Sequence, residues 1–208
     1  MATTTPAAPV KSKRGLYIGL GILAVIVLFF ISGYNGMVKA DETVNQKWSD
    51  VESSYQRRID LIDNLVNSVK GAADFEKSTL TEIVEARARA TGMTIDPSKA
   101  SPEQLKAFTE AQNGMSSALS RLLVVVENYP TLTATQAYRD LMSSLEGTEN
   151  RINVARIDYN AAIKDYNTRI RRFPASIIAS VTGFDRRNGF AAAEGADKVP
   201  EVDFSDNK

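Results

Sequence analysis

The chain contains no cysteine and no histidine. The lack of cysteine excludes disulfides, thiolate-bound metals and a lipid attached to a cysteine. The lack of histidine removes the commonest general base and the commonest metal ligand, so catalytic triads and zinc chemistry are excluded as well. A carboxylate-based enzyme stays open. We nevertheless predict that the protein is not an enzyme and that it has no catalytic, cofactor-binding or metal-binding residues.

Basic residues are too few outside the N-terminal region to favour a nucleic-acid partner. The formal net charge is zero over 208 residues, but Lys11, Lys13, Arg14 and Lys39 all precede the first acidic residue. Without these four, the rest of the chain has 21 basic and 25 acidic residues, a net charge of about −4. Nucleic-acid-binding surfaces are basic. We therefore expect no nucleic-acid partner.

The longest uncharged run extends from Gly15 to Val38. Its roughly 24 residues reach about 36 Å as a helix, enough to cross a hydrocarbon core of about 30 Å. The cations before the run predict a cytoplasmic N-terminus and an extracytoplasmic C-terminal domain, because basic residues stay on the cytoplasmic side. No proline interrupts the helix before Ala73, although Gly33 and Gly36 could loosen it near the bilayer surface.

A cleaved signal peptide is the alternative to a permanent anchor. The tripeptide Val38-Lys39-Ala40 resembles a cleavage site, and the basic start resembles the first region of a signal peptide. The apolar run is longer than the usual core of about 7–15 residues, and helical patterning resumes directly after Ala40. We favour an uncleaved anchor, and the sequence leaves cleavage open.

The rest of the chain shows helical periodicity and no stretch with the strict alternation of a half-buried strand. Apolar residues recur at steps of three and four over about 41–73, 75–90, 102–129 and 135–173. Four such helices with short connections bury their apolar stripes against one another. We predict an all-α fold, with an N-terminal single transmembrane helix followed by an antiparallel up-and-down four-helix bundle whose first and last helices are long.

Several helix ends carry recognisable signals. Ser101, Pro102 and Gln104 predict a capping box that starts the third helix, and Pro130 predicts its end. Further candidate caps are Asp74 for the second helix and Thr133 or Thr135 for the fourth.

These patterns divide the chain into four expected segments. They are a cytoplasmic N-terminal segment at 1–14, a transmembrane helix at 15–38, a four-helix bundle domain at 39–184 and an irregular C-terminal tail at 185–208. The tail is rich in glycine, alanine and acidic residues, a composition typical of chain that does not form a packed core.

Short motifs in a fixed order connect the chain to a known family. They are Tyr34-Asn35, Trp48, Arg57-Arg58-Ile59-Asp60-Leu61-Ile62, Asn64-Leu65-Val66, Val69-Lys70-Gly71, Glu85-Ala86-Arg87, Tyr129-Pro130, Thr148-Glu149-Asn150-Arg151-Ile152, Ala155-Arg156, Tyr159-Asn160, Tyr166-Asn167 and Phe173-Pro174. Together they resemble the LemA family of bacterial membrane proteins, over about Tyr34 to Phe190. One departure is Asp63, where many relatives carry proline, which makes a kink there less expected.

The resemblance implies an N-terminal membrane segment, a helical bundle and no catalytic activity that can be carried onto residues. It also implies a bacterial cytoplasmic (inner) membrane location, crossed once. Members look like accessory proteins of the envelope, and one relative takes part in building magnetosome membranes. We therefore expect a non-enzymatic envelope scaffold or adaptor. Its expected partners are the lipid bilayer and unidentified envelope proteins, and a homo-oligomer stays open. The alternatives are a carboxylate-based envelope enzyme and a ligand-binding sensor.

An amphipathic segment follows the fourth helix. Because an even number of antiparallel helices returns the chain to its starting end, this segment should lie near the bilayer. The candidate membrane-interface residues are Arg171, Arg172, Phe173, Ile177, Ile178, Val181 and Phe184. An apolar face with basic flanks, which here include Arg186 and Arg187, suits an interface rich in anionic lipid. We predict that Pro174 starts a short membrane-lying helix. The alternative is that the apolar side chains plug the base of the bundle.

Two other motifs carry two interpretations each. The repeated pairs Tyr159-Asn160 and Tyr166-Asn167 indicate either a partner-recognition strip or tyrosines packed in the seam with asparagines on the flank, and we favour packing. Trp48 is either an anchor at the membrane interface or part of the bundle core.

Charged and small residues leave further questions open. The residues Glu149, Arg151 and Arg156 could form a buried network with Arg58 or Glu85, which we expect to set helix register. The alternating charges of Arg57, Arg58, Asp60 and Asp63 are typical of a solvated face. The small seam residues Thr148, Ala155 and Ala162 indicate either room for a ligand or close approach of two helices.

Overall fold

The computed structural model describes residues 14–70 and 76–191, and all regular structure within these ranges is helical. The elements are α1 (Arg14–Lys70), α2 (Lys77–Thr91), α3 (Pro102–Val126), α4 (Pro130–Thr133), α5 (Gln136–Arg171) and α6 (Ala175–Thr182). The prediction of an all-α fold with a long apolar N-terminal helix is confirmed.

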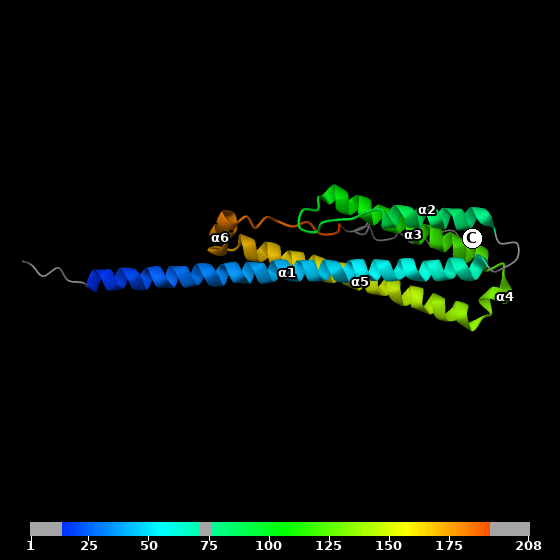
Figure 1. Ribbon diagram of the computed structural model, residues 1–208, viewed down its shortest axis with the longest axis horizontal. Helices are drawn as coiled ribbons and strands as arrows, with labels where there is room; N and C mark the ends of the chain where they lie inside the picture. Colours follow the sequence, from blue (N-terminus) through cyan, green and yellow to red (C-terminus); the bar gives the residue numbers. More distant parts are fainter. Residues whose placement is uncertain (1–13, 71–75, 192–208) are drawn as a thin grey trace, which may run out of the picture.

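The longer helices lie side by side along one axis (Figure 1). α1 and α5 are antiparallel, because Lys47 bonds to Asp158 and, further along α1, Arg58 bonds to Glu149. α2 and α3 form a helical hairpin that packs beside this pair. α1 and α5 extend beyond the hairpin at the end of the bundle nearer the apolar run of α1, where the short helix α6 lies beside them.

Most helix ends follow the sequence signals. The Ser101 hydroxyl accepts from the N–H of Gln104 at 3.2 Å, and the Gln104 side chain accepts from the N–H of Ser101 at 2.9 Å, so the predicted capping box is confirmed. Thr135, one of the two candidates, caps α5. Pro130 lies after the end of α3 and starts the one-turn helix α4, a role that we did not predict. Asp74 lies outside the described residues.

α1 runs without a break for 57 residues, from the apolar run into the bundle. Gly33 and Gly36 do not interrupt it. A Cβ on Gly33 would lie 2.6 Å from Cδ1 of Ile178, and a Cβ on Gly36 would lie 2.8 Å from Nη1 of Arg169. These two glycines therefore let α6 and the end of α5 approach α1, and the helix itself stays regular.

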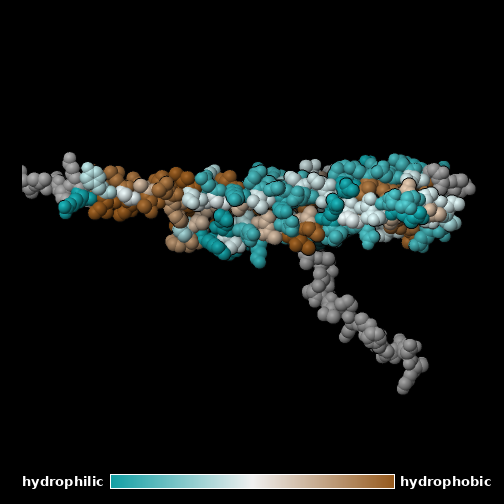
Figure 2. All heavy atoms as spheres, turned by 90° about the horizontal axis from the view of Figure 1, so that it is seen from below, coloured by the Kyte–Doolittle hydropathy of each residue, from teal (hydrophilic) through white to brown (hydrophobic). Residues whose placement is uncertain are grey.

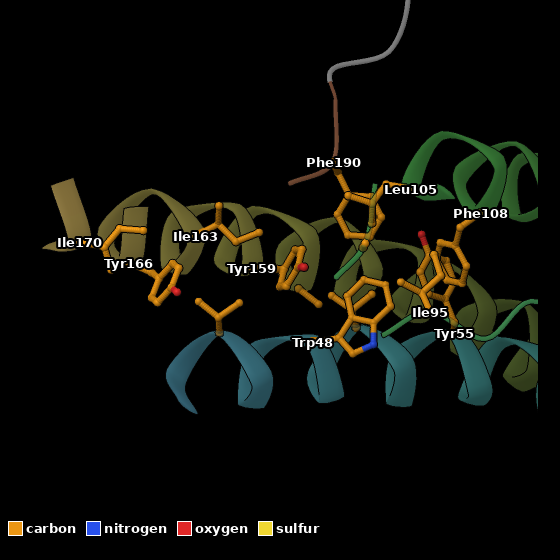
Figure 3. Close-up of a cluster of buried hydrophobic side chains, with 14 of the residues drawn as sticks. Trp48, Tyr55, Ile95, Leu105, Phe108, Tyr159, Ile163, Tyr166, Ile170 and Phe190 are labelled. Atoms are coloured by element: carbon orange, nitrogen blue, oxygen red, sulfur yellow. The ribbon is translucent and has the colours of Figure 1, made fainter. Parts of the chain in front are cut away.

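The buried side chains form two clusters along the bundle. The cluster nearer the apolar run, here called the proximal core, is rich in aromatic rings and includes Trp48, Tyr55, Phe108, Tyr159, Tyr166 and Phe190 (Figure 3). The other cluster, the distal core, is mainly aliphatic and includes Ile62, Leu65, Ile83, Met115, Leu122 and Leu145. Trp48 is only 3% exposed, so it packs in the bundle and does not anchor at the interface.

A buried arginine separates the two cores. Arg58 is 2% exposed and follows Tyr55 of the proximal core by one helical turn. Its guanidinium donates to Oγ of Ser116 at 3.0 Å, to Oε1 of Glu149 at 3.1 Å, and to both the side chain and the carbonyl of Gln112. The guanidinium also lies over the Tyr55 ring.

This network corrects one expectation and confirms another. Arg58 does not belong to a solvated face, because its side chain is buried and binds two residues of α3 and one of α5. The predicted link from Arg58 to Glu149 is confirmed. Arg156 contributes elsewhere, since its guanidinium lies over the Phe190 ring, and Arg151 is exposed.

The small seam residues lie where α5 faces α1. Thr148 and Ala155 are buried, and Ala162 packs against the proximal core. Thr148 donates its hydroxyl to the carbonyl of Ser144 one turn earlier, so its polar group is satisfied within α5. The three residues therefore support close approach of the two helices.

Residues 185–191 have neither helix nor strand, but they pack against the bundle. We call them the C-terminal segment. Phe190, within it, is 6% exposed and belongs to the proximal core. The core therefore extends beyond position 184, where we had placed the end of the bundle. The remainder of the expected tail, 192–208, lies outside the described residues.

The two Tyr-Asn pairs have divided roles. Tyr159 and Tyr166 are 0% and 2% exposed and pack in the seam, as the favoured interpretation predicts. Asn160 and Asn167 lie on the flank of the seam, where their side chains bind the backbone of the C-terminal segment. The two asparagines therefore bind an extended segment of the same chain.

Candidate membrane-facing site

α1 leaves the bundle as a single helix. Residues 14–32 are exposed throughout, and one helix in the described part of the chain, α1 itself, is apolar enough to cross a membrane. Figure 2 shows hydrophobic atoms along this free part of α1. Its roughly 19 residues span about 28 Å, close to the thickness of a hydrocarbon core. The base of the bundle therefore begins where a bilayer would end.

α6 lies against α1 at this base. Ile178 is 3% exposed and packs over Gly33, and the Phe184 ring lies 5.7 Å from the Tyr34 ring, centroid to centroid. Gly33 and Tyr34 directly follow the exposed part of α1. The short helix is thus held at the boundary between the candidate span and the bundle.

The opposite side of the segment faces outward. Phe173 is 82% exposed, Ile177 is 57% exposed and Val181 is 74% exposed. The four-residue spacing of Ile177 and Val181 places these two side chains on one side of α6, and Phe173 precedes the helix at the turn. Three large apolar side chains are therefore exposed at the end of the bundle that adjoins the apolar part of α1.

The structure brings all seven predicted interface residues to the base but divides them into two groups. Phe173, Ile177 and Val181 point outward together with the cationic side chains of Arg171 and Arg172. Ile178 and Phe184 point inward, as the plug interpretation predicts, because they fill the space beside Gly33 and Tyr34. The plug interpretation therefore describes the inward face, and contact of the outward face with lipid stays a prediction.

The cations at the base differ in their surroundings. Arg171 and Arg172 are exposed and so is Arg169, which reaches toward Gly36. Arg187, which we had counted among the basic flanks, is buried and binds Oδ1 of Asp41 at 2.8 Å. The cationic surface is therefore supplied mainly by the last turn of α5.

The residues of α1 that seat α6 were missed by sequence analysis. Gly33 and Tyr34 lie inside the uncharged run, which we assigned as a whole to the membrane. The four-residue region Gly33–Gly36 holds two glycines one turn apart, a pattern that permits close approach of another helix. This spacing was the available signal.

The site is made of apolar and cationic side chains. Among the described residues, no group of three or more acidic side chains is placed to hold a metal ion. Above the base, burial raises the pKa of Tyr166, whose hydroxyl donates to the carbonyl of Asp185 at 2.9 Å. Its neighbourhood therefore favours the neutral phenol, which can donate this bond.

Known proteins resemble the chain along most of its length. The profile of the LemA family matches residues 47–204. The chain is similar to Magnetosome protein MamQ 2 of Paramagnetospirillum magneticum, with 33% identity over 208 residues that cover 88% of this chain and 75% of the relative. It is also similar to Magnetosome protein MamQ of Magnetospirillum gryphiswaldense, with 29% identity over 86% of this chain and 74% of the relative.

A more distant relative carries the family's own name. Protein LemA of Metamycoplasma hominis is 22% identical over 173 residues, which cover 82% of this chain and 75% of that protein. The family profile spans more than half of the chain, from the first bundle helix past the C-terminal segment. The chain therefore belongs to the LemA family.

Proposed function

We propose that the protein is a non-enzymatic scaffold of the cytoplasmic membrane that organises the bilayer and holds envelope proteins near it. Its N-terminus is cytoplasmic and its bundle is extracytoplasmic. One observation carries the proposal: α6 is seated at the end of the free part of α1 and presents Phe173, Ile177 and Val181 outward. A bundle of this kind touches the membrane at two places, the span and the base.

The energetics favour contact of this face with lipid. Each of the three apolar side chains gains about 1.5–3 kcal/mol when it is fully removed from water. Arg171 and Arg172 each add about 1 kcal/mol near an anionic surface. Two attachments restrict the tilt of the bundle relative to the membrane. A bundle attached through the span alone can tilt, whereas one that also contacts the membrane through its base is held at one angle.

The comparisons support a role in membrane organisation. The relatives in Paramagnetospirillum and Magnetospirillum are named magnetosome proteins. The charge distribution supports the orientation, since Lys11, Lys13 and Arg14 precede the apolar run and the acidic residues follow it. The bundle is then free to bind other envelope proteins along its exposed sides.

Fluorescent labelling of the full chain tests the base contact. The chain has no cysteine, so Val181→Cys, Ile177→Cys and the control Ser68→Cys near the far end of α1 each carry one environment-sensitive dye. In vesicles of phosphatidylethanolamine and phosphatidylglycerol, we expect blue-shifted emission and quenching by brominated lipid at positions 177 and 181, and neither at 68. Water-like emission at 177 and 181 would overturn the proposed contact.

Two further measurements test the biological part. An impermeant maleimide applied to intact cells should label Ser68→Cys and leave Thr5→Cys unlabelled, and the reverse result would invert the orientation. Full chain reconstituted in vesicles should alter their shape or tether them, and the pair Ile177→Ser and Val181→Ser should weaken this effect. In-cell crosslinking then identifies the envelope proteins that the bundle holds.

A further inference from the structure

The C-terminal segment is held by two asparagine side chains that act like a neighbouring strand. Asn160 accepts the N–H of Phe190 at 2.9 Å and donates to its carbonyl at 3.0 Å. Asn167 accepts the N–H of Arg187 at 3.0 Å and donates to its carbonyl at 2.8 Å. Each carboxamide thus satisfies both backbone groups of one residue, which is what a paired strand does.

The spacing of the two asparagines matches an extended chain. Seven residues of helix advance about 10.5 Å between Asn160 and Asn167. Three residues of extended chain advance about 10 Å between Arg187 and Phe190. The segment runs antiparallel to α5, so one carboxamide meets every third residue in register. The seven-residue spacing of the two asparagines therefore matches the spacing of every third residue in an extended peptide.

Two side chains of the segment enter distinct pockets. The guanidinium of Arg187 binds Asp41 at 2.8 Å and Asn45 at 2.7 Å, and it lies 5.5 Å from the centre of the Tyr166 ring. The Phe190 ring is stacked on Trp48 with centroids 5.8 Å apart, as Figure 3 shows from the side. One pocket is acidic and aromatic, and the other is aromatic and apolar.

The residue before Phe190 is restricted as well. A Cβ on Gly189 would lie 2.6 Å from Oδ1 of Asn160, the atom that accepts the N–H of Phe190. Asn188 is less restricted, since it is exposed and its side chain donates to the carbonyl of Ala100. The groove between α1 and α5 therefore selects an extended segment of the form Arg-x-Gly-Phe.

We propose that this groove is a peptide-binding site that accepts the C-terminal segment of a second copy of the chain. The contacts of Arg187 and Phe190 with the groove are made to α1, α3 and α5, so a segment supplied by a neighbour makes the same bonds. Exchange of an identical segment between copies requires no new interface. The segment is attached to α6 through Gly183 and Phe184, with no regular structure of its own.

Anchoring favours the exchange. Copies that share one bilayer are parallel and confined to a plane, which raises the effective concentration of each segment near a neighbouring groove. The inference uses only this anchoring from the proposed function. It does not depend on whether Phe173, Ile177 and Val181 touch lipid, so a failure of either leaves the other in place.

Disulfide trapping tests exchange in the full chain. Chains carrying Ala100→Cys and chains carrying Asn188→Cys, with tags of different size, are reconstituted together in vesicles of phosphatidylethanolamine and phosphatidylglycerol and oxidised. We expect an intermolecular disulfide several-fold above that of Ala100→Cys mixed with Ser180→Cys on α6. Replacing Asn160 and Asn167 with Ala should remove the excess, whereas Asn150→Ala with Asn153→Ala on the exposed side of α5 should not.

A control with both cysteines in one chain shows how the absence of a disulfide between chains should be interpreted. One chain carrying both Ala100→Cys and Asn188→Cys should close on itself, which shows that the two sulfurs can reach each other. Closure in the single chain with no excess disulfide between chains would overturn the exchange.

A peptide titration provides an independent measurement. Trp48 is the single tryptophan and stacks on Phe190, so its emission reports whether the groove is filled. In the full chain with Phe190→Ala, a synthetic peptide of residues 183–191 should restore the native emission in a saturable manner. The same peptide carrying Phe190→Ala or Gly189→Ala should not. No saturable change with the native peptide would overturn the site.

Discussion

The proximal and distal cores differ in how they are closed. The distal core is enclosed by the apolar seams of four helices and is mainly aliphatic. The proximal core begins beside Leu105 and Phe108 of α3 and continues along α1 and α5 beyond the hairpin (Figure 1). Its further walls come from α6, from Ile95 and Ala100 of the α2–α3 connection and from Phe190. Large aromatic rings fill the space between these elements. A two-helix stretch can thus be completed by short segments that are not bundle helices.

The largest expected effect is the opening of the proximal core by Phe190→Ala. The ring lies against Trp48 and Tyr159 with centroids 5.8 and 5.6 Å away, and its removal leaves a cavity between them. We expect a loss of about 3–5 kcal/mol in the free energy of unfolding. Hydrogen exchange should accelerate around Trp48 and Tyr159 more than in the distal core. Equal acceleration in both cores would show that they open as one unit.

The distal core should respond to Leu145→Ala with a loss of about 2–5 kcal/mol, since Leu145 is 2% exposed and aliphatic truncations leave a cavity. Denaturant titration of the detergent-solubilised chain measures it. The matched control is Val154→Ala on the exposed side of α5, which should change stability by less than about 0.5 kcal/mol. Hydrogen exchange after Leu145→Ala should accelerate first on the α2–α3 hairpin, the opposite pattern to Phe190→Ala.

The boundary between the cores depends on Arg58. Arg58→Met removes the donor to Gln112, which is 3% exposed, and leaves its side chain unsatisfied in the interior. We expect a loss of about 1–3 kcal/mol. The double change Arg58→Met with Gln112→Met should recover most of it, because an apolar pair replaces a buried polar pair at little cost. Additive losses in the double variant would contradict this account.

The distal core was the part of the fold that the sequence predicted well. Its residues recur at helical spacing on helices whose ends carry caps such as Ser101 and Thr135, and such signals are local. Phe190 carries no local signal, because its partners Trp48 and Tyr159 are distant in sequence and its own segment has the composition of a loop. Arg58 was assigned both to a solvated face and to a network with Glu149, and sequence alone could not decide between them because its partners lie on α3 and α5.

The sequence predicted which residues form the candidate site but not which way their side chains face. Periodicity placed Ile177, Ile178 and Val181 on one short helix, and the structure has this helix against α1 at the base of the bundle. Periodicity could not decide which of them faces α1, because that depends on where Gly33 allows close approach. The function of Asn160 and Asn167 could not be predicted either, because their partners Phe190 and Arg187 come 20 to 30 residues later in the chain.

The smallest expected effect concerns Tyr159, which joins α5 to the proximal core. Burial raises the pKa of its hydroxyl from about 10 to about 12. The folded state therefore prefers the neutral phenol, and the stabilisation that this preference gives is complete below about pH 10 and is lost as the pH rises toward 12. By pH 11 we expect a loss of about 1.4 kcal/mol in the free energy of unfolding, the equivalent of one pKa unit.

The variant Tyr159→Phe tests this pH dependence. The Tyr159 hydroxyl has no hydrogen-bond partner among the described residues, so the variant should leave stability at pH 7 within about 1 kcal/mol of the original. Denaturant titrations at pH 8 and pH 11 should show that Tyr159→Phe reduces the alkaline loss. An unchanged alkaline loss in Tyr159→Phe would assign it to Tyr55 and Tyr166, whose pKa values burial also raises, and would remove the phenol of Tyr159 from the energetics of the proximal core.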